Sequence, residues 1–178
     1  MSRRAVFLDR DGVLNRARVV DGRPYPPRDL AALSILPGVA AACAALAGKG
    51  FLLVGVSNQP DIARGLTPAA TVAAINRHLA AALGLDDLRV CPHDDGDRCA
   101  CRKPRPGLLL AAARDFDIDL RCSIMVGDRW RDVAAGRAAG CRTVFVDHGY
   151  DERRPEGADL TCDGLPAALP WIIGEVEP

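Results

Sequence analysis

The sequence predicts an α/β protein in which a parallel sheet is covered by helices on both faces. Five short apolar runs have the length and composition of strands that are buried on both sides. Helical stretches separate most of these runs, and alternation of this kind is typical of a parallel sheet. Ligands of such sheets bind beyond the carboxyl ends of the strands. Functional residues are therefore expected directly after the apolar runs.

The predicted strands are Ala5–Leu8, Phe51–Val56, Leu88–Cys91, Ser123–Val126 and Thr143–Val146. Proline and glycine indicate where several helices begin and end. The first predicted helix is opened by Pro37 and closed by Gly50. The second has Thr67 as N-cap and Pro68 at N1, and it ends before Gly84. Three more are predicted at Gly107–Phe116, Asp132–Ala139 and Leu165–Ile173. Residues 16–36 are expected to form an irregular loop over the active end. No linker or repeat is evident, so we expect one domain over residues 1–178.

The composition excludes several functional classes. Hydrophobic residues make up 49% of the 178 residues and charged residues 26%, which is ordinary for a soluble globular protein. No apolar run approaches the roughly 20 residues of a membrane span, and the N-terminal segment turns acidic at Asp9, unlike a signal peptide. Lys+Arg and Asp+Glu both total 23, which argues against broad binding to nucleic acid or anionic membranes. We expect a cytoplasmic protein that binds neither nucleic acid nor a membrane.

The first chemical motif is the segment Phe-Leu-Asp9-Arg-Asp11-Gly-Val-Leu-Asn15. If strand geometry continues past Leu8, Asp9 and Asp11 point to the same side, because side chains alternate with period two. Two carboxylates about 6–7 Å apart repel each other unless a cation or a shared proton lies between them. Clusters of carboxylate oxygens suit Mg²⁺. A pair of solvated turn aspartates is the alternative for this segment alone.

Three further motifs follow other predicted strands or loops. They are Ser57-Asn58-Gln59 with the nearby Arg64, then Arg102-Lys103, and then Gly127-Asp128 with Asp132 four residues later. Each alone has an ordinary alternative: loop chemistry, a solvated basic turn, or a helix cap at Asp132. Together they place carboxylates, a hydroxyl, amides and cations at one edge of the sheet. Asn58, Gln59 and the arginines are candidate contacts to substrate phosphate.

Phosphoryl transfer through an aspartyl-phosphate requires such a set. Asp9 would attack phosphorus and also bind Mg²⁺, while Asp11 would act as general acid and then as general base. Asp128 would hold the metal together with the backbone carbonyl of Asp11. Ser57 and Lys103 would stabilise the equatorial oxygens of the transition state. Asp132 could orient a metal-bound water or cap a helix, and His148 has no assigned role.

These motifs, in this order, resemble the four motifs of the haloacid dehalogenase (HAD) superfamily over roughly residues 4 to 148. The resemblance implies a Rossmann-like sheet. It also implies the nucleophile at Asp9 and the acid/base at Asp11, with Ser57, Lys103 and Asp128 in the remaining roles.

A cluster of three cysteines and one histidine lies between the third strand and Lys103. Cys91, His93, Cys99 and Cys101 form the Cys₃His set of a structural zinc site, with no open coordination position. Unrelated free thiols and a disulfide are the alternatives. The loop ends in Arg102-Lys103, so zinc would determine where these cations point.

The zinc loop resembles one branch of the superfamily, within subfamily IIIA, which contains the heptose bisphosphate phosphatases and the histidinol-phosphate phosphatases. The resemblance implies a small phosphorylated metabolite as substrate, with Arg102 and Arg129 in contact with it. Removal of the 7-phosphate of D-glycero-D-manno-heptose 1,7-bisphosphate is the first expectation, and histidinol phosphate or another small sugar phosphate is the alternative.

The spacing of the motifs leaves no room for a separate cap domain. Only 46 positions separate Asp11 from Ser57, and a helix and a strand fill most of them. We therefore expect a capless, open site that functions in a monomer. A phospho-acceptor signalling domain and a zinc-based binding module are the non-enzymatic alternatives.

Overall fold

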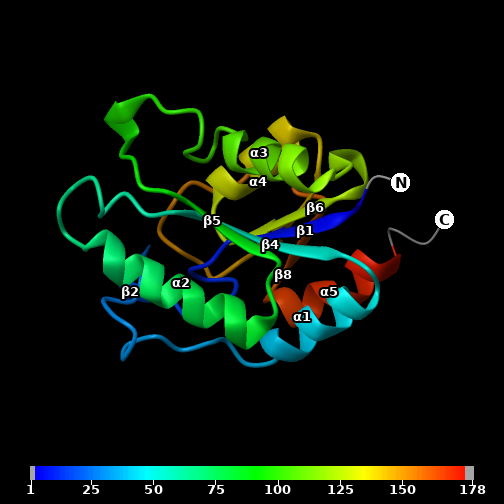
Figure 1. Ribbon diagram of the computed structural model, residues 1–178, viewed down its shortest axis with the longest axis horizontal. Helices are drawn as coiled ribbons and strands as arrows, with labels where there is room; N and C mark the ends of the chain where they lie inside the picture. The colour runs from blue at the N-terminus through cyan, green and yellow to red at the C-terminus, as the bar shows by residue number, and fades with distance from the viewer. Residues whose placement is uncertain (1–2, 175–178) are drawn as a thin grey trace.

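A six-stranded parallel sheet lies between two layers of helices in the computed structural model, which describes residues 3–174 (Figure 1). Its strands are β1 (Ala5–Leu8), β4 (Leu52–Asn58), β5 (Asp87–Cys91), β6 (Ile124–Gly127), β7 (Arg142–Val146) and β8 (Leu160–Cys162). Their spatial order is β5-β4-β1-β6-β7-β8, and every neighbouring pair is parallel. Counted along the chain, this is the order 3-2-1-4-5-6 of the Rossmann fold. The predicted α/β class and Rossmann-like sheet are confirmed.

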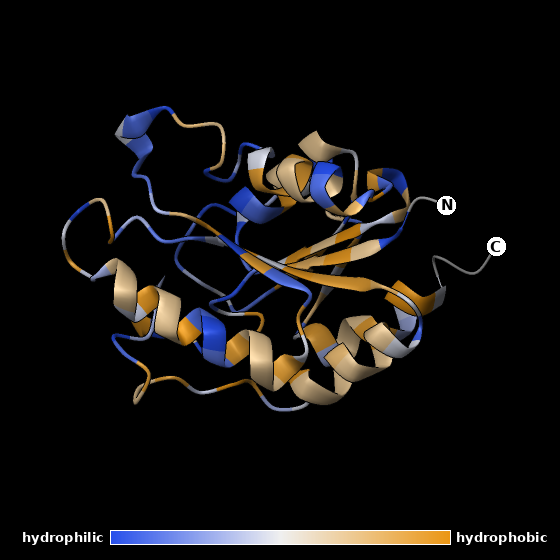
Figure 2. Cartoon of the chain, in the orientation of Figure 1, coloured by the Kyte–Doolittle hydropathy of each residue, from blue (hydrophilic) through white to orange (hydrophobic). Residues whose placement is uncertain are grey.

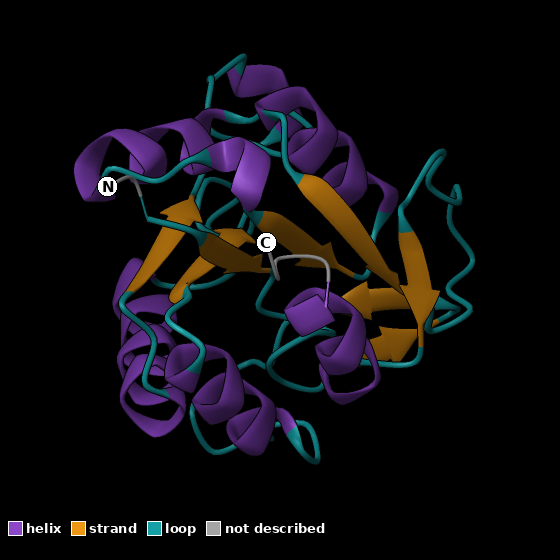
Figure 3. Ribbon diagram, turned by 90° about the vertical axis from the view of Figure 1, so that its right-hand side faces the viewer, coloured by secondary structure: helices purple, strands orange, loops and turns teal. Residues whose placement is uncertain are grey.

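Helices cover both faces of the sheet (Figures 1 and 3). One layer consists of α1 (Val39–Gly48), α2 (Ala69–Leu83) and α5 (Leu165–Gly174), and the other of α3 (Gly107–Phe116) and α4 (Trp130–Ala139). Strand β1 shows how the sequence supports both layers, because Val6 and Leu8 belong to one hydrophobic core whereas Ala5 and Phe7 belong to the other. All four side chains are fully buried. The strands accordingly form an apolar centre between the helices (Figure 2).

Two short structures within predicted loops were missed. The segment predicted as an irregular loop, residues 16–36, contains an antiparallel hairpin of β2 (Arg18–Val20) and β3 (Arg23–Tyr25). Its turn is Asp21-Gly22, and both residues have positive φ, as a type I′ turn requires. Strand β8 extends the sheet beyond β7, although its three residues are too short to give a clear pattern.

Three predicted helix starts were wrong by one to two residues. Helix α1 begins at Val39 rather than at Pro37, because Gly38 is the N-cap. Helix α4 begins at Trp130 rather than at Asp132, and Asp132 occupies the third helical position, where its carboxylate accepts the backbone N–H of Arg129 at 3.0 Å. Helix α2 begins at Ala69, and Pro68 is the N-cap in place of Thr67, because Pro68 has extended backbone with ψ of 138°.

The chain inserts little between the strands of the sheet. The hairpin and α1 lie between β1 and β4, and α2 follows β4. After β5 come the cysteine-rich loop, which contains the 3₁₀ helix η1 (Asp95–Asp97), and then α3, while the 3₁₀ helix η2 (Leu120–Cys122) precedes β6. The capless arrangement is thus confirmed. Between residues 3 and 174, no helix combines the length and apolar character that a membrane crossing requires.

Candidate active site and metal centres

Three carboxylates meet at the carboxyl ends of β1 and β6, on either side of the point where the strand order reverses. Asp9 follows β1, Asp128 follows β6, and Asp132 lies in the first turn of α4. Each offers an oxygen within 4.8 Å of an oxygen of the others, and their side chains are buried. The Lys103 ammonium lies among them, 2.7 Å from Asp9 Oδ1 and 2.6 Å from Asp132 Oδ1. The sheet topology therefore joins residues that are up to 123 positions apart in the sequence.

The charge balance of this cluster favours a divalent cation. Three carboxylates and one ammonium leave two negative charges uncompensated in a buried site. Burial raises the pKa of Asp9 even though Lys103 opposes the shift, and burial together with repulsion from Asp9 and Asp132 raises the pKa of Asp128 well above its usual range. Within the described chain Asp128 makes no hydrogen bond of ordinary geometry, and the nearby Tyr150 hydroxyl only partly opposes the rise in its pKa. Buried polar atoms without partners are rare, and the two carboxylate oxygens of Asp128 have the chemistry of Mg²⁺ ligands.

Gly12 allows the metal-binding residues to approach one another. Its φ of +93° lies in the region that favours glycine, and a Cβ atom there would lie 1.8 Å from Asp128 Oδ2. The turn after Asp11 therefore needs glycine both for its backbone conformation and for the space that Asp128 occupies.

Asp11 points away from this cluster into a separate hydrogen-bond network. Its carboxylate accepts hydrogen bonds from the Arg10 guanidinium, from Asn15 Nδ2 at 3.0 Å and from Gln59 Nε2 at 2.8 Å. The same Gln59 amide nitrogen donates to Ser57 Oγ at 2.8 Å. Gln59 is only 2% exposed and does not line the cavity in front of Asp9. It thus connects two of the expected catalytic groups, although we had expected it to contact substrate.

Asn58 holds the backbone of Lys103 in place. Its side-chain amide donates to the Lys103 carbonyl at 3.0 Å and accepts from the Lys103 N–H at 3.1 Å. The Lys103 ammonium also donates to the Val56 carbonyl at 2.7 Å. A lysine that is 2% exposed is therefore fully hydrogen-bonded, and its carboxylate partners raise its pKa despite burial. It remains a cation at any physiological pH.

A cavity of about 300 Å³ opens in front of Asp9. The predicted site residues that line it are Asp9, Asp11, Asn58, Arg64, Arg102, Lys103 and Arg129, whereas Ser57, Gln59 and Asp128 lie outside this lining. The lining also includes Asp132, for which two roles were predicted, and residues without a predicted role: Arg23, Pro24, Tyr25 and Pro26 of the hairpin region, Pro60 and Asp61, Asp95, Arg131 and Glu152. The Asp-Gly turn could have indicated the hairpin. Nothing in the local sequence indicates Glu152.

The three predicted substrate-binding arginines each pair with a carboxylate, which for Arg64 and Arg129 comes from another loop and for Arg102 from the same cysteine-rich loop. Arg64 donates two hydrogen bonds to Asp94, and Arg102 donates to Asp95 at 2.8 Å. Arg129 pairs with Glu152 through two hydrogen bonds. Their guanidinium groups are therefore oriented at the cavity by partners that lie between 7 and 30 positions away in sequence.

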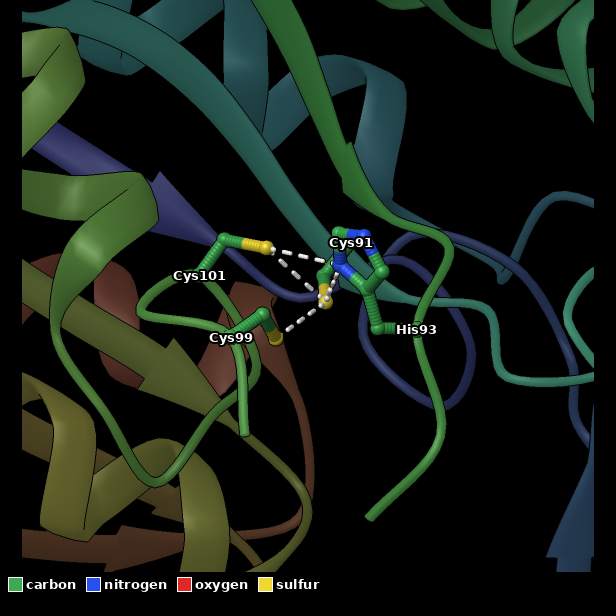
Figure 4. Close-up of side chains that lie close together, drawn as sticks. All are labelled: Cys91, His93, Cys99 and Cys101. Atoms are coloured by element: carbon green, nitrogen blue, oxygen red, sulfur yellow. Dashed lines mark hydrogen bonds between the residues drawn. The ribbon is translucent and has the colours of Figure 1, made fainter. Parts of the chain in front are cut away.

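The side chains of Cys91, His93, Cys99 and Cys101 converge beside the cavity (Figure 4). The Sγ atom of Cys91 lies 3.1 Å from that of Cys101 and 3.6 Å from that of Cys99, and His93 Nδ1 lies 3.3 and 3.5 Å from two of the sulfurs. A tetrahedron with Zn–S bonds of about 2.3 Å has sulfur–sulfur edges of about 3.8 Å. All seven cysteines are free, so the disulfide alternative is not realised. The donor set fits a zinc ion.

Burial acts to raise the pKa of the Cys99 thiol. Hydrogen bonds from the Arg102 backbone and the neighbouring thiols outweigh it and lower this pKa to about 7. Burial raises the pKa of the Cys91 and Cys101 thiols, so among the three cysteines of the cluster only Cys99 has a lowered pKa that favours the thiolate form in which cysteine binds metal.

The fold and the carboxylate-lysine cluster define a hydrolase of the HAD type, in which an aspartate follows the first strand of a Rossmann-like sheet. The comparisons with known proteins agree. A family model described as HAD-hydrolase-like matches residues 100–168. The chain is 36% identical to the D-glycero-beta-D-manno-heptose-1,7-bisphosphate 7-phosphatase of Bordetella bronchiseptica, over 96% of this chain and 98% of that protein.

Two further similarities extend this result. The D-glycero-alpha-D-manno-heptose-1,7-bisphosphate 7-phosphatase of Mycobacterium tuberculosis is 40% identical over 79% of this chain and 78% of its own length. A crystal structure of the B. bronchiseptica D,D-heptose 1,7-bisphosphate phosphatase, complexed with magnesium and phosphate, superposes with a TM-score of 0.80 over 97% of this chain and 99% of that one. The chain therefore belongs to the HAD superfamily, in the branch of the heptose-1,7-bisphosphate 7-phosphatases.

Proposed function

We propose that the protein removes the 7-phosphate of D-glycero-D-manno-heptose 1,7-bisphosphate through an aspartyl-phosphate formed on Asp9. The observation that carries this proposal is the buried cluster of Asp9, Asp128, Asp132 and Lys103, which faces a cavity lined by arginines. Lys103, together with Mg²⁺ when it is bound, would offset the charge of one phosphate, and the arginines supply cations for a second. The similarity to phosphatases of this substrate over nearly the whole chain supports the same assignment.

In the first step an Asp9 oxygen attacks phosphorus, and the bond from phosphorus to the sugar oxygen breaks. Asp11, which lines the cavity, would leave its pairing with Arg10, bind a proton and donate it to the departing alkoxide. Lys103 and the Ser57 hydroxyl stabilise charge on the equatorial oxygens, and Lys103 is already held beside Asp9 before substrate binds.

In the second step Asp11, now a carboxylate, takes a proton from water. The resulting nucleophile attacks phosphorus, which releases phosphate and regenerates Asp9. Gln59 contributes by orienting Asp11 relative to Ser57, since its amide nitrogen donates to both side chains.

Asp9 and Asp128 would hold Mg²⁺ together with the Asp11 carbonyl, and the ion would supply positive charge against the substrate phosphate when bound. Asp132 has a different role in this proposal. Its two oxygens accept hydrogen bonds from Lys103 and from the Arg129 backbone, so it positions Lys103 rather than the metal.

We further infer that Cys91, His93, Cys99 and Cys101 bind one structural zinc ion. All four donors come from protein, so no coordination position remains for chemistry. The protein is proposed to work as a cytoplasmic monomer. Its seven free cysteines suit a reducing compartment, and the cluster and cavity are complete within one chain.

The test is phosphate release with Mg²⁺ from both anomers of heptose 1,7-bisphosphate and from histidinol phosphate, with Asp9→Asn as control. A strong preference for one heptose anomer that is lost in the variant supports the proposal. Preference for histidinol phosphate would retain the mechanism and change the substrate. A stable phosphoprotein without turnover would favour a phospho-acceptor domain, and the absence of both would contradict the enzymatic assignment.

A further inference from the structure

The cysteine-rich loop carries two adjacent carboxylates that bind arginines at the cavity. Asp94 and Asp95 follow the zinc-loop residue His93 directly. Asp94 accepts two hydrogen bonds from Arg64, at 2.7 and 2.8 Å. Asp95 Oδ1 accepts one from Arg102 Nε at 2.8 Å and one from Arg131 Nη1 at 3.0 Å. Asp95 Oδ1 is thus a shared acceptor for two guanidinium groups, that of Arg102 at the end of the loop and that of Arg131 in the first turn of α4.

Arg102 is held by this loop in a defined orientation. Its Nη1 also donates to the His93 carbonyl at 3.3 Å, and the residue is only 8% exposed. A guanidinium has five N–H donors in a rigid plane, so these two contacts leave donors for an anionic ligand in the cavity.

Lys103, in contrast, forms ion pairs with Asp9 and Asp132 at the end of the cavity where the reaction is proposed to occur. The arginines make no contact of this kind with Asp9; their carboxylate partners belong to the surrounding loops. They are therefore available for an anionic group of the substrate other than the phosphate that reacts.

We propose that Asp95 is a positioning residue that directs Arg102 and Arg131 toward a second phosphate of the substrate, so that the zinc loop determines specificity for a bisphosphate over a monophosphate. This inference rests on the proposed function. Without the shared acceptor, two like-charged guanidinium groups would lie side by side and separate, and their orientation would no longer match a phosphate.

The test compares Asp95→Ala and Asp95→Glu with Asp97→Ala. Asp97 lies in the same 3₁₀ helix, where its carboxylate accepts the Asp94 backbone N–H at 2.7 Å, so its removal disturbs the loop without removing an arginine partner. The substrates are heptose 1,7-bisphosphate and p-nitrophenyl phosphate, which lacks a second phosphate. Zinc content is measured for every variant.

Asp95→Ala should raise KM for the bisphosphate about fivefold or more while kcat changes by less than about twofold, because the lost interaction concerns binding. Its activity toward p-nitrophenyl phosphate and its zinc content should be unchanged. Asp95→Glu should restore part of the affinity, and Asp97→Ala should not change the ratio of the two KM values.

An unchanged or lower KM for the bisphosphate in Asp95→Ala would overturn the inference, and so would an equal loss toward both substrates. A lower KM would mean that the carboxylate only competes with substrate. Calorimetric binding of the bisphosphate in an Asp9→Asn background separates the two proposals. If the wild type hydrolyses neither substrate, the proposed function fails. The effect of Asp95→Ala on the calorimetric affinity for the bisphosphate still decides the role of Asp95.

Discussion

Replacement of Asp128 by asparagine should raise the stability of the Mg²⁺-free protein while abolishing its activity. Asp128 is 2% exposed, and it makes no hydrogen bond of ordinary geometry within the described residues. Burial and the nearby carboxylates of Asp9 and Asp132 raise its pKa well above the usual range. At pH 7.5 the folded protein without metal must therefore either carry an unfavourable negative charge at this position or bind a proton there, and an amide of nearly the same shape needs neither.

Two opposing contributions determine the size of the effect. An uncompensated buried charge destabilises a protein by about 3–5 kcal/mol. A buried amide whose hydrogen bonds are unmet costs about 1–3 kcal/mol. The balance favours Asp128→Asn by about 2 kcal/mol, which corresponds to a rise in Tm of roughly 4–8 °C for a protein of this size.

The assay is thermal unfolding in EDTA at pH 7.5 and again with Mg²⁺, together with phosphatase activity. Mg²⁺ should raise the Tm of the wild type and leave that of Asp128→Asn unchanged. Asp11→Asn is the matched control, because its carboxylate pairs with Arg10, which is fully buried. Asp11→Asn should therefore lower the Tm in EDTA although it also abolishes activity. A lower Tm for Asp128→Asn in EDTA, or an undiminished response to Mg²⁺, would refute the reasoning.

Two further predictions concern the same cluster. Lys103→Met should lower kcat about 10²–10³-fold, because one preorganised cation is lost, and should lower the stability of the Mg²⁺-free protein by about 3–5 kcal/mol, as measured by chemical denaturation. An equal loss of stability with saturating Mg²⁺ would contradict the charge argument. The raised pKa values of Asp9 and Asp128 mean that the folded state binds more protons than the unfolded chain above pH about 4, so Mg²⁺-free stability should fall as the pH rises above that value. The free energy of unfolding of Asp128→Asn should depend less steeply on pH than that of the wild type, because one of the two carboxyl groups with a raised pKa is absent.

The sheet and the position of its reactive edge could be predicted from local patterns. All five predicted strands are present, and each agrees with the structure to within two residues at both ends. Buried parallel strands leave a strong apolar signal in the sequence, and the rule that ligands bind beyond the carboxyl ends brings Asp9 and Asp128 to one edge. The cysteine spacing likewise indicated a metal-binding loop whose four donors converge. These features depend on residues close together in sequence.

The orientation of side chains within the site could not be predicted in the same way. Alternation along a strand placed Asp9 and Asp11 on one side, but the chain turns at Gly12, and Asp11 pairs with buried Arg10 instead of joining the carboxylates. Asp132 had two open roles, and its contacts now favour the positioning of Lys103. Such choices depend on which charges share a buried volume, and that information appears only after the chain has folded.

Gln59 illustrates why a motif can indicate a site without indicating the role of each member. A polar residue after a strand can face either the ligand or the catalytic groups beneath it, and the sequence Ser-Asn-Gln is compatible with both. Asp11 and Ser57 are both partly or fully buried, and the Gln59 amide donates to each of them. A buried carboxylate requires donors, so the amide is more strongly stabilised there than in the open cavity. The lining of the open cavity instead carries the longer cations Arg64, Arg102 and Arg129, each of which pairs with a carboxylate.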